Sequence, residues 1–596
     1  MLFILGVIAF LQMTILPGSV VMIYSRFKPE SKLQGIVYIF GTGLITNYIV
    51  VYVLTMFEVY GSPSMYLLFA LETALLVYAW IKNGKQSHIP VYFTGWFERI
   101  KGFFNSNSTL YNVLFLIGLG FILLFFKTWA SRFWEVFYQN DAVLSWNRWA
   151  LDWYGNHFPI DTWFYPQLLS TNWSMAYHIM QNPDIQLIPR NIMGFFPIAM
   201  AFLFLDLGIR KKNSMYFTAL IIYSMVIRYL FSAEFLTDGY TEIPVTFFAF
   251  LSFYVLHRLD SPFQFKTIDA YLSIAFAAAA AGTKQAGVYI LVFIICWNVV
   301  LFIKNKAVFP KRTILKVTGV ILLIISVIAL SWYLNRVYNI MYGFEKPGIK
   351  VVTQDVHQGR TYLERVSFGF QRILHAQDNP GSTVLPLILL LSFFLLCSLF
   401  YKRSRYITLF IIVPFIALWA FFFSYDVRNI SMAIPFIGFS GAAGSHLFIS
   451  RLFEWMKKIP QFRFPVWLIV VSFVACLVLL NFTVFNQKRM VDSQIKQQRK
   501  IGILALNEKL YDFYEKHGFE GKVFSKYTYF RFLPGLKNYW ALDRTSQGVC
   551  YFLEDYSVTN KEILRDIKIK IKEGKYKVLF TVNQYKLIQV KQKGDN

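Results

Sequence analysis

The chain has 596 residues, of which 56% are hydrophobic and only 15% are charged, and its net charge at pH 7 is +26. A soluble globular domain carries roughly 25% charged residues, so this composition excludes an ordinary soluble protein. The positive charge does not indicate a nucleic-acid partner, because the basic residues lie in short loops between apolar runs, as in the cytoplasmic loops of membrane proteins.

Apolar runs of about 20 residues recur along the chain, each long enough to cross a hydrocarbon core of ~30 Å as a helix. The first run has no basic start and is too long for a cleaved signal peptide, so we expect it to be the first spanning helix. The pattern predicts an α-helical polytopic membrane protein of about fourteen transmembrane helices, at residues 2–24, 34–58, 61–81, 110–128, 190–208, 214–231, 242–257, 268–283, 285–303, 313–335, 382–401, 406–424, 430–450 and 464–485.

Clusters of lysine and arginine all fall on one side of the membrane if every run spans it. The positive-inside rule makes that side the cytoplasm, so both termini should be extracytoplasmic. Three long segments should then lie outside: residues 129–189, residues 336–381, and the tail from about residue 486. The short loops and the lack of a targeting signal suit a bacterial inner membrane.

The tail differs in composition from the rest of the chain. It is rich in lysine and glutamate, and a helical stretch at Ile501–His517 precedes short β-like runs at Lys522–Ser525, Tyr576–Val582 and Leu587–Val590. We predict that it forms a small soluble α/β domain. The four cysteines show neither a metal-binding spacing nor a disulfide framework.

The first long outer segment contains an aromatic helix. Trp146, Trp149 and Trp153 recur at helical spacing, which favours a helix that lies flat at the membrane–water boundary. Asp141 stands at the start of this helix. An N-cap is one interpretation, since Asp accepts hydrogen bonds from exposed backbone amides there, and a catalytic role is the other.

Other charged residues gather in the short outer turns. The turn Ser232–Pro244 carries Glu234, Asp238 and Glu242, and the next outer turns carry Lys284 and then Asp426 with Arg428. Solvated carboxylates, a lysine that snorkels and a simple ion pair would each explain one turn. The predicted spans, by contrast, hold almost no charge, with Glu72 the main exception, whereas ion-coupled transporters place ionisable groups near the midplane.

At these residues the sequence resembles the GT-C superfamily of membrane glycosyltransferases, and more narrowly the bacterial relatives of protein mannosyltransferases and of lipid A aminoarabinose transferases. Asp141 matches the acidic residue of their first large outer loop. Gly239–Pro244 is similar to a GYADIP pattern with Glu242 in place of Asp, and Thr283–Gly287 fits a T-K-X-X-G turn. A looser match is the turn formed by Tyr425, Asp426, Arg428 and Asn429 before Pro435.

The resemblance covers roughly residues 110–485 and implies a division into three parts. Family members usually begin with one helix before the catalytic loop, whereas three extra helices precede it here. Residues 1–109 would therefore be accessory helices with a cytoplasmic loop. Residues 110–485 would form the catalytic module with the outer loops 129–189 and 336–381. Residues 486–596 would form the extracytoplasmic domain.

The resemblance also implies the reaction, an inverting transfer of a sugar, of the hexosyltransferase type, from a polyprenyl-phosphate donor to an acceptor at the outer membrane face. Asp141 would deprotonate the acceptor hydroxyl. Glu242 would orient the acceptor or hold Lys284. Cations would stabilise the phosphate that leaves with the lipid: Lys284, Arg428 and Arg228.

The resemblance implies a role in making a cell-envelope glycan. It also implies that loop residues complete the site. The loop 336–381 would close over the donor or rest on the bilayer, with contacts from an amphipathic stretch, Arg360–Gln377, and from His357 and Arg360. Tyr240 and Asp238 would add further contacts. No cofactor is required, although Asp141 and Glu242 together could bind a divalent cation.

The acceptor is a lipid, a glycan or a protein, and the membrane lipid itself is a partner. The main alternative function is a flippase or transporter of lipid-linked sugar or polysaccharide, which the number of predicted helices also suits. A non-catalytic assembly protein is the third hypothesis.

Overall fold

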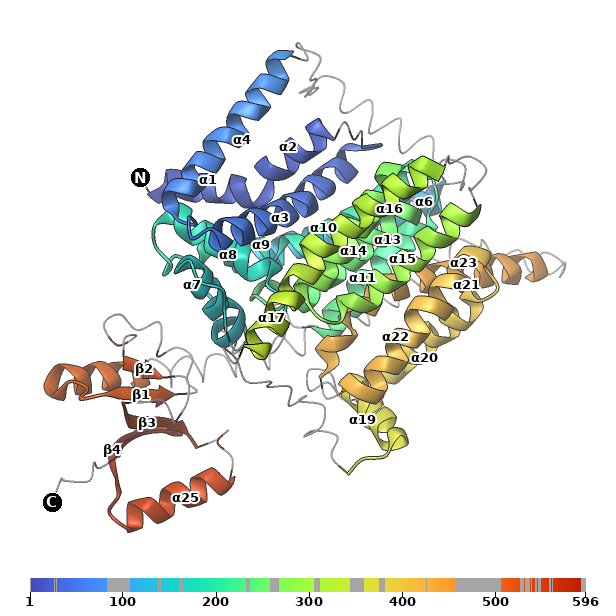
Figure 1. Cartoon of the computed structure of the whole chain (residues 1–596). Helices are drawn as coiled ribbons and strands as arrows, with labels where there is room; N and C mark the ends of the chain where they lie inside the picture. Colours follow the sequence, from blue (N-terminus) through green and yellow to red (C-terminus); the bar gives the residue numbers. More distant parts are fainter. Residues whose placement is uncertain are drawn as a thin grey trace. The chain divides into compact units, whose positions relative to one another are not determined.

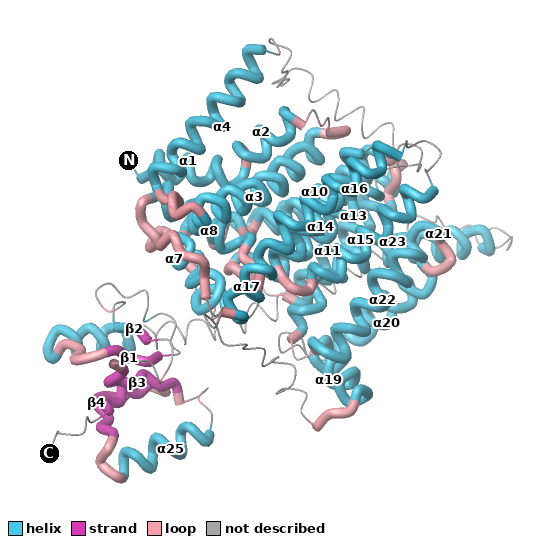
Figure 2. The backbone as a smooth tube through the Cα atoms, viewed as in Figure 1, coloured by secondary structure: helices cyan, strands magenta, loops and turns pink. Residues whose placement is uncertain are grey.

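The structure is a computed structural model. It describes residues 2–25, 27, 29–82, 108–137, 139, 141–160, 162, 165–231, 236–257, 267–304, 311–342, 359–374, 381–424, 426–456, 505–525, 530, 536, 539–541, 544, 548–556, 559 and 561–590. The chain divides into two compact units, which are described separately (Figures 1 and 2). The first contains Met1–Phe137 and Ser145–Val484, and the second contains Tyr138–Leu144 and Phe485–Asn596.

The first unit is built from apolar helices, most of which coincide with the predicted runs. Eight are long and apolar enough to cross a membrane: Leu2–Tyr24, Lys32–Met56, Ser62–Lys82, Thr109–Ala130, Leu187–Arg210, Leu315–Met341, Ser404–Phe423 and Val427–Leu452. Five shorter apolar helices accompany them: Met215–Leu230, Glu242–Leu256, Ile268–Thr283, Gly287–Ile303 and Leu385–Ser398. A helical, membrane-embedded protein is thus confirmed, while the last predicted run, 464–485, lies outside the described residues.

The N-terminal helices pack closely. They are α1 (Leu2–Thr14), α2 (Leu16–Tyr24), α3 (Lys32–Met56) and α4 (Ser62–Lys82). A Cβ atom on Gly18 of α2 would lie 1.8 Å from the carbonyl oxygen of Ile39 in α3. This position therefore requires glycine, because the two helix backbones touch there without an intervening side chain.

The segment 129–189, predicted as an outer loop, contains several helices. It contains α7 (Arg148–Tyr154) and α8 (Leu168–Met180), followed by α9 (Leu187–Ile192). All 13 residues of α8 are buried, and α8 packs against α1, α3 and α7. The expectation that the tryptophan side chains of this helix lie at the membrane–water boundary is wrong, because Trp149 and Trp153 are 1% and 0% exposed. These rings pack inside the protein, where α8 and Tyr165 cover them.

The remaining helices of this unit pack mainly as neighbours along the chain. The first are α6 (Thr109–Ala130), α10 (Phe195–Arg210), α11 (Met215–Leu230), α13 (Glu242–His257), α14 (Thr267–Thr283), α15 (Gly287–Lys304), α16 (Lys311–Ile325), η4 (Ser326–Leu330) and α17 (Ser331–Met341). After them come α19 (Tyr362–Leu374), α20 (Gly381–Ser398), α21 (Lys402–Ile407), η6 (Thr408–Ile412), α22 (Val413–Leu418), η7 (Trp419–Phe423), η8 (Val427–Ala433) and α23 (Ile434–Met456). Helices that are distant in the sequence also meet, since α23 packs against α11. Helix α23 packs against α20 as well.

The second unit contains a five-stranded mixed sheet in the order β2-β1-β3-β5-β4. Its elements are β1 (Lys522–Ser525), β2 (Trp540–Ala541), β3 (Val549–Asp555), α25 (Lys561–Lys572), β4 (Tyr576–Val582) and β5 (Tyr585–Val590). Helix 505–517 covers one face of the sheet through Leu506 and Leu510, and α25 covers the other through Ile567. The predicted small sheet domain at the C-terminus is confirmed, although β2, β3 and α25 were not predicted.

Candidate functional site

The segment 236–242, which ends at the first residue of α13, supplies three of the predicted site residues and is buried. Asp238 is 0% exposed, Tyr240 9% and Glu242 6%. Gly239 between them has a φ angle of +87°, a backbone region that favours glycine. On one side of this tight turn Thr237 and Asp238 belong to one polar cluster, and on the other side Glu242 belongs to another.

The first cluster, the lysine cluster, consists of Glu242, Lys284 and Asn429. The Lys284 ammonium donates hydrogen bonds to Glu242 Oε1 and to Asn429 Oδ1, each at 2.9 Å. The two charged side chains are 13% and 7% exposed, so the ion pair is largely desolvated. Removing one partner from such a pair leaves a buried charge and costs about 3–5 kcal/mol.

Lys284 reaches this position because α14 and α15 are joined by a very tight turn. The Lys284 amide donates to the Ala280 carbonyl, and the Gly287 amide donates to the Lys284 carbonyl. A Cβ atom on Gly287 would lie 2.2 Å from the Ala280 carbonyl group. Glycine at this place therefore brings the ends of the two helices together and presents Lys284 at their junction.

Arg428 and Asp426 lie beside the lysine cluster. The Arg428 Nε donates to Asp426 Oδ2 at 2.6 Å, and the Arg428 backbone amide donates to Asp426 Oδ1 at 2.9 Å. The guanidinium group also lies over the Tyr240 ring, 4.5 Å from its centroid. Each of the two cations is thus paired with a carboxylate, so these four charges balance and form a polar rather than a strongly cationic site.

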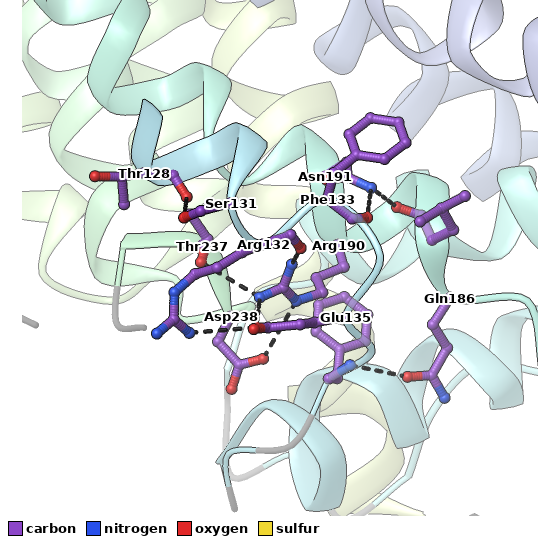
Figure 3. Close-up of polar contacts among 12 residues, drawn as sticks. Thr128, Ser131, Arg132, Phe133, Glu135, Gln186, Arg190, Asn191, Thr237 and Asp238 are labelled. Carbon is purple, nitrogen blue, oxygen red and sulfur yellow. Dashed lines mark hydrogen bonds and ion pairs between the residues drawn. The ribbon is translucent and has the colours of Figure 1, made fainter. Parts of the chain in front are cut away.

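The second cluster, the arginine cluster, is centred on Arg190 of α9 (Figure 3). Arg190 is 1% exposed, and its Nη2 lies 2.7 Å from Glu135 Oε2 while its Nε lies 3.7 Å from Asp238 Oδ1. Its Nη1 donates to the Arg132 carbonyl, and Nη2 lies 3.5 Å from Thr237 Oγ1. One guanidinium group therefore connects the segment after α6 with the segment before α13.

Neighbouring residues fasten the same segment to α9. The Asn191 side-chain amide donates to the Phe133 carbonyl at 2.7 Å, and the Trp129 indole donates to the Asn191 carbonyl at 2.9 Å. The Phe137 amide donates to Gln186 Oε1 at 3.1 Å. Figure 3 shows the contact between Asn191 and Phe133 and the contact made by Gln186. The segment that leads toward Asp141 is thus anchored by side chains of α9 and of the residue before it.

Sequence reasoning missed Arg190. The only available signal was a single arginine at the outer end of a predicted apolar run, on the side with few basic residues. Lys284 showed the same signal and was selected. The partners of Arg190 could not be inferred, because they come from two segments about 50 residues away on either side of it along the chain.

The remaining predicted site residues are Asp141, Arg228, His357 and Arg360. Asp141 is exposed, directly precedes η2 (Ala142–Asn147) and belongs to the second unit, whereas Glu242 belongs to the first. Arg228 is half-buried in the last turn of α11. Arg360 is half-buried, with its guanidinium 4.1 Å from the Phe368 ring centroid. His357 lies outside the described residues.

The amphipathic stretch predicted at Arg360–Gln377 contains α19, which packs against η7 and η8. Its Leu363 is 80% exposed and Phe370 is 43% exposed. Within the described parts of the chain, no group of three or more His, Cys, Asp and Glu side chains is placed to hold a metal ion. The divalent cation considered for Asp141 and Glu242 therefore finds no third ligand of these types there.

Comparison with known proteins adds no relative. No protein-family model matches the chain, and neither a curated protein nor a solved structure matches it. The arguments about function below therefore start from the lysine and arginine clusters themselves.

Proposed function

We propose that the protein is a glycosyltransferase that moves a sugar from a polyprenyl-phosphate donor to an acceptor at the extracytoplasmic face of the bacterial inner membrane. The observation that carries this proposal is the environment of Lys284. An ammonium group has three hydrogens to donate, and Lys284 uses two of them, for Glu242 and Asn429, among the described residues. Because its side chain is 13% exposed, the third hydrogen can reach a ligand.

The partly exposed ammonium suits the leaving group of this reaction. When the bond between the sugar and the phosphate breaks, negative charge develops on the lipid phosphate, and a preorganised donor stabilises that charge. The contacts with Glu242 and Asn429 hold the ammonium in one place, so little reorganisation is needed during the reaction. In this proposal Arg428, whose guanidinium lies over the Tyr240 ring, is a second donor to the same phosphate.

The acidic residues take different roles in this proposal. Glu242 is buried and bonded to Lys284, which makes it a positioning residue rather than the base. Asp141 is exposed at the start of η2, where an acceptor hydroxyl can approach it, and it is our candidate for the general base. No metal ion is needed for these steps.

The alternative function, a flippase or transporter of lipid-linked sugar, is favoured by a different observation. Glu72, in the middle of α4, contacts a buried group of amide side chains. Ionisable residues in such positions often belong to ion-coupled transport pathways. The experiment below therefore includes a transport measurement.

The test uses the purified full-length protein, a panel of radiolabelled polyprenyl-phosphate sugars and a membrane extract as the acceptor source. We expect turnover by the wild type and a loss of about 10²- to 10³-fold in Lys284→Gln, because one transition-state donor is removed. Asp141→Asn should lose about 10²- to 10⁴-fold, as expected for a general base. Lys212→Gln, which changes an exposed lysine after α10, is the control and should keep full activity.

Three results would contradict the proposal. The wild type could consume no donor in the panel, or both site variants could turn over like the wild type. Movement of lipid-linked sugar across liposomes without chemical turnover would identify the transporter instead.

A further inference from the structure

A buried polar network, which shares no residue with the lysine and arginine clusters, joins helices α1, α3, α4 and α8. Its members are Gln12 of α1, Asn47 of α3, Glu72 of α4 and Asn172 of α8. Glu72 is 5% exposed, and the other three residues are 0% exposed. Gln12 and Glu72 both lie near the middle of apolar helices that are long enough to span a membrane.

Gln12 and Asn47 donate the hydrogen bonds that join the side chains of this network. The Asn172 amide donates to two backbone carbonyl groups and accepts a hydrogen bond from Asn47 Nδ2 at 3.1 Å. Asn47 Nδ2 also donates to the Gln12 backbone carbonyl at 3.1 Å. Gln12 Nε2 then donates to Asn47 Oδ1 at 3.3 Å and to Glu72 Oε2 at 2.9 Å. Each side-chain amide has two hydrogens, and all of them are used.

The end of the network therefore has more acceptors than donors. Gln12 Oε1 is buried and has no hydrogen-bond partner within the described part of the chain. The Glu72 carboxyl group accepts one hydrogen bond there, from Gln12, and makes no ion pair with a described residue. An ionised carboxylate with so few partners in an apolar environment costs several kcal/mol. A proton on Glu72 removes that charge and supplies the missing donor.

The ionisable groups on the packed helices do not compensate Glu72. On α2, the Tyr24 hydroxyl donates to a backbone carbonyl of α4, and on α8 the Tyr177 hydroxyl donates to Asn147. His178 of α8 contacts Ser62, the first residue of α4, and Lys82 is the last residue of α4. Ser62 and Lys82 are each ten residues from Glu72, which is about 15 Å along the helix. Helix α1 has no ionisable side chain. A metal cation is also a poor fit, since hard cations take about six oxygen ligands.

We propose that Glu72 is a proton-binding site and that the bound proton keeps α4 docked on the other N-terminal helices. Helix α4 packs against α2 and α8 on one side only, and its Leu67 and Ile81 are 71% and 67% exposed. Its attachment therefore depends on few contacts, among them the Glu72–Gln12 hydrogen bond and the hydrogen bond from the Tyr66 hydroxyl to the Ile179 carbonyl at 2.8 Å. Loss of the proton leaves a carboxylate that water must solvate, which loosens α4. This proposal does not depend on the transfer reaction proposed above.

The test uses the full-length protein in lipid nanodiscs over a range of pH. Infrared difference spectroscopy detects the carbonyl band of a protonated carboxyl group, and hydrogen exchange of α4 peptides, corrected for the intrinsic effect of pH, reports its docking. In the wild type we expect a carboxylic-acid band that disappears at high pH. The undocked population of α4 should then rise about tenfold, and hydrogen exchange in α4 should become faster by the same factor. Glu72→Gln, which resembles the protonated acid, should lose the band and keep α4 protected at every pH.

Glu58→Gln is the matched control, because it removes an exposed carboxylate from the turn before α4 and should leave both signals unchanged. The proposal is overturned if the wild-type band is absent at every pH, or if it persists in Glu72→Gln. It is also overturned if exchange in α4 rises with pH equally in the wild type and in Glu72→Gln. Replacement of the proton by Na⁺ at constant pH, seen as a sodium-dependent loss of the band, would identify a metal-cation site instead.

Discussion

The Lys284 ammonium lies 2.9 Å from Glu242 Oε1, and this contact joins the first residue of α13 to the turn between α14 and α15. The pair is largely buried and also binds Asn429, which follows Arg428 in η8. Three separate segments therefore meet at one ammonium group. Its loss should affect the stability of the protein as well as any chemistry at this site.

A double-mutant cycle at this pair should show strong coupling. Glu242→Gln or Lys284→Met alone should lower stability by about 3–5 kcal/mol, because each leaves the other charge buried without a partner. The double variant should be less destabilised than the sum of the two, which thermal unfolding in detergent can measure. Additive effects would show that the contact contributes little.

Arg190 should be essential for the arrangement of the segments around it. Arg190→Ala removes contacts with Glu135, Thr237, Asp238 and a backbone carbonyl, and should cost about 3–5 kcal/mol because it leaves Asp238 buried without this cation. Limited proteolysis should then cut more readily near residues 131–137. Arg190→Lys should restore only part of the stability, since an ammonium cannot reproduce the planar guanidinium contacts.

The control for Arg190 is an exposed ion pair at the end of α23. Arg451 and Glu454 lie 3.1 Å apart, with side chains 75% and 65% exposed. Arg451→Ala should change stability by less than about 1 kcal/mol. Equal losses in the Arg190 and Arg451 variants would mean that burial of Arg190 has no energetic consequence.

The contact between α20 and α23 should not tolerate even one additional methyl group. A Cβ atom on Gly444 would lie 1.8 Å from the Phe394 carbonyl oxygen, so Gly444→Ala must push the helices apart at a cost of about 1–3 kcal/mol. Gly120→Ala in α6 is the matched control, because nothing lies within 4 Å of its Cβ position. That variant should be neutral or slightly more stable, since alanine favours helix. Similar unfolding temperatures for the two variants would contradict this prediction.

His178 should make the protein sensitive to acid. Burial lowers the pKa of this imidazole to about 4, below the ordinary value of 6.5, because the charged form is poorly solvated between Tyr60 and Tyr154. The unfolded chain then binds the proton more readily, so stability is complete above pH 6.5 and falls as the pH drops toward 4. The loss should be about 1.4 kcal/mol for each pH unit in this interval.

Unfolding of the wild type and of His178→Gln at several pH values measures this effect. The stability of the wild type relative to the variant should decrease below pH 6.5, since glutamine does not titrate in this range. His517→Gln, at an exposed histidine in the second unit, should follow the wild type. A constant difference between wild type and His178→Gln would show that His178 is not the sensitive group.

Much of the helical framework could be predicted because a membrane leaves the chain little choice. An apolar segment in lipid must satisfy its backbone hydrogen bonds internally, so each long apolar run forms a helix. The predicted runs coincide closely with helices such as Lys32–Met56 and Thr109–Ala130. Helix α8 was missed because Ser170, Asn172 and His178 interrupt its apolar pattern. In the structure, Ser170 and Asn172 donate hydrogen bonds to backbone carbonyls of η2 and α3, which makes their burial favourable.

The sequence by itself determined that this is a helical membrane protein with a small sheet domain at its C-terminus, because composition and run length suffice for that conclusion. It also indicated Glu242 and Lys284, each of which stands out at the end of an apolar run. Only the tertiary structure decided that these two residues bind each other, and that Arg190 connects Glu135 with Asp238. The physical reason is that a buried charge needs a partner, and the packing of helices distant in sequence chooses which residue that partner is.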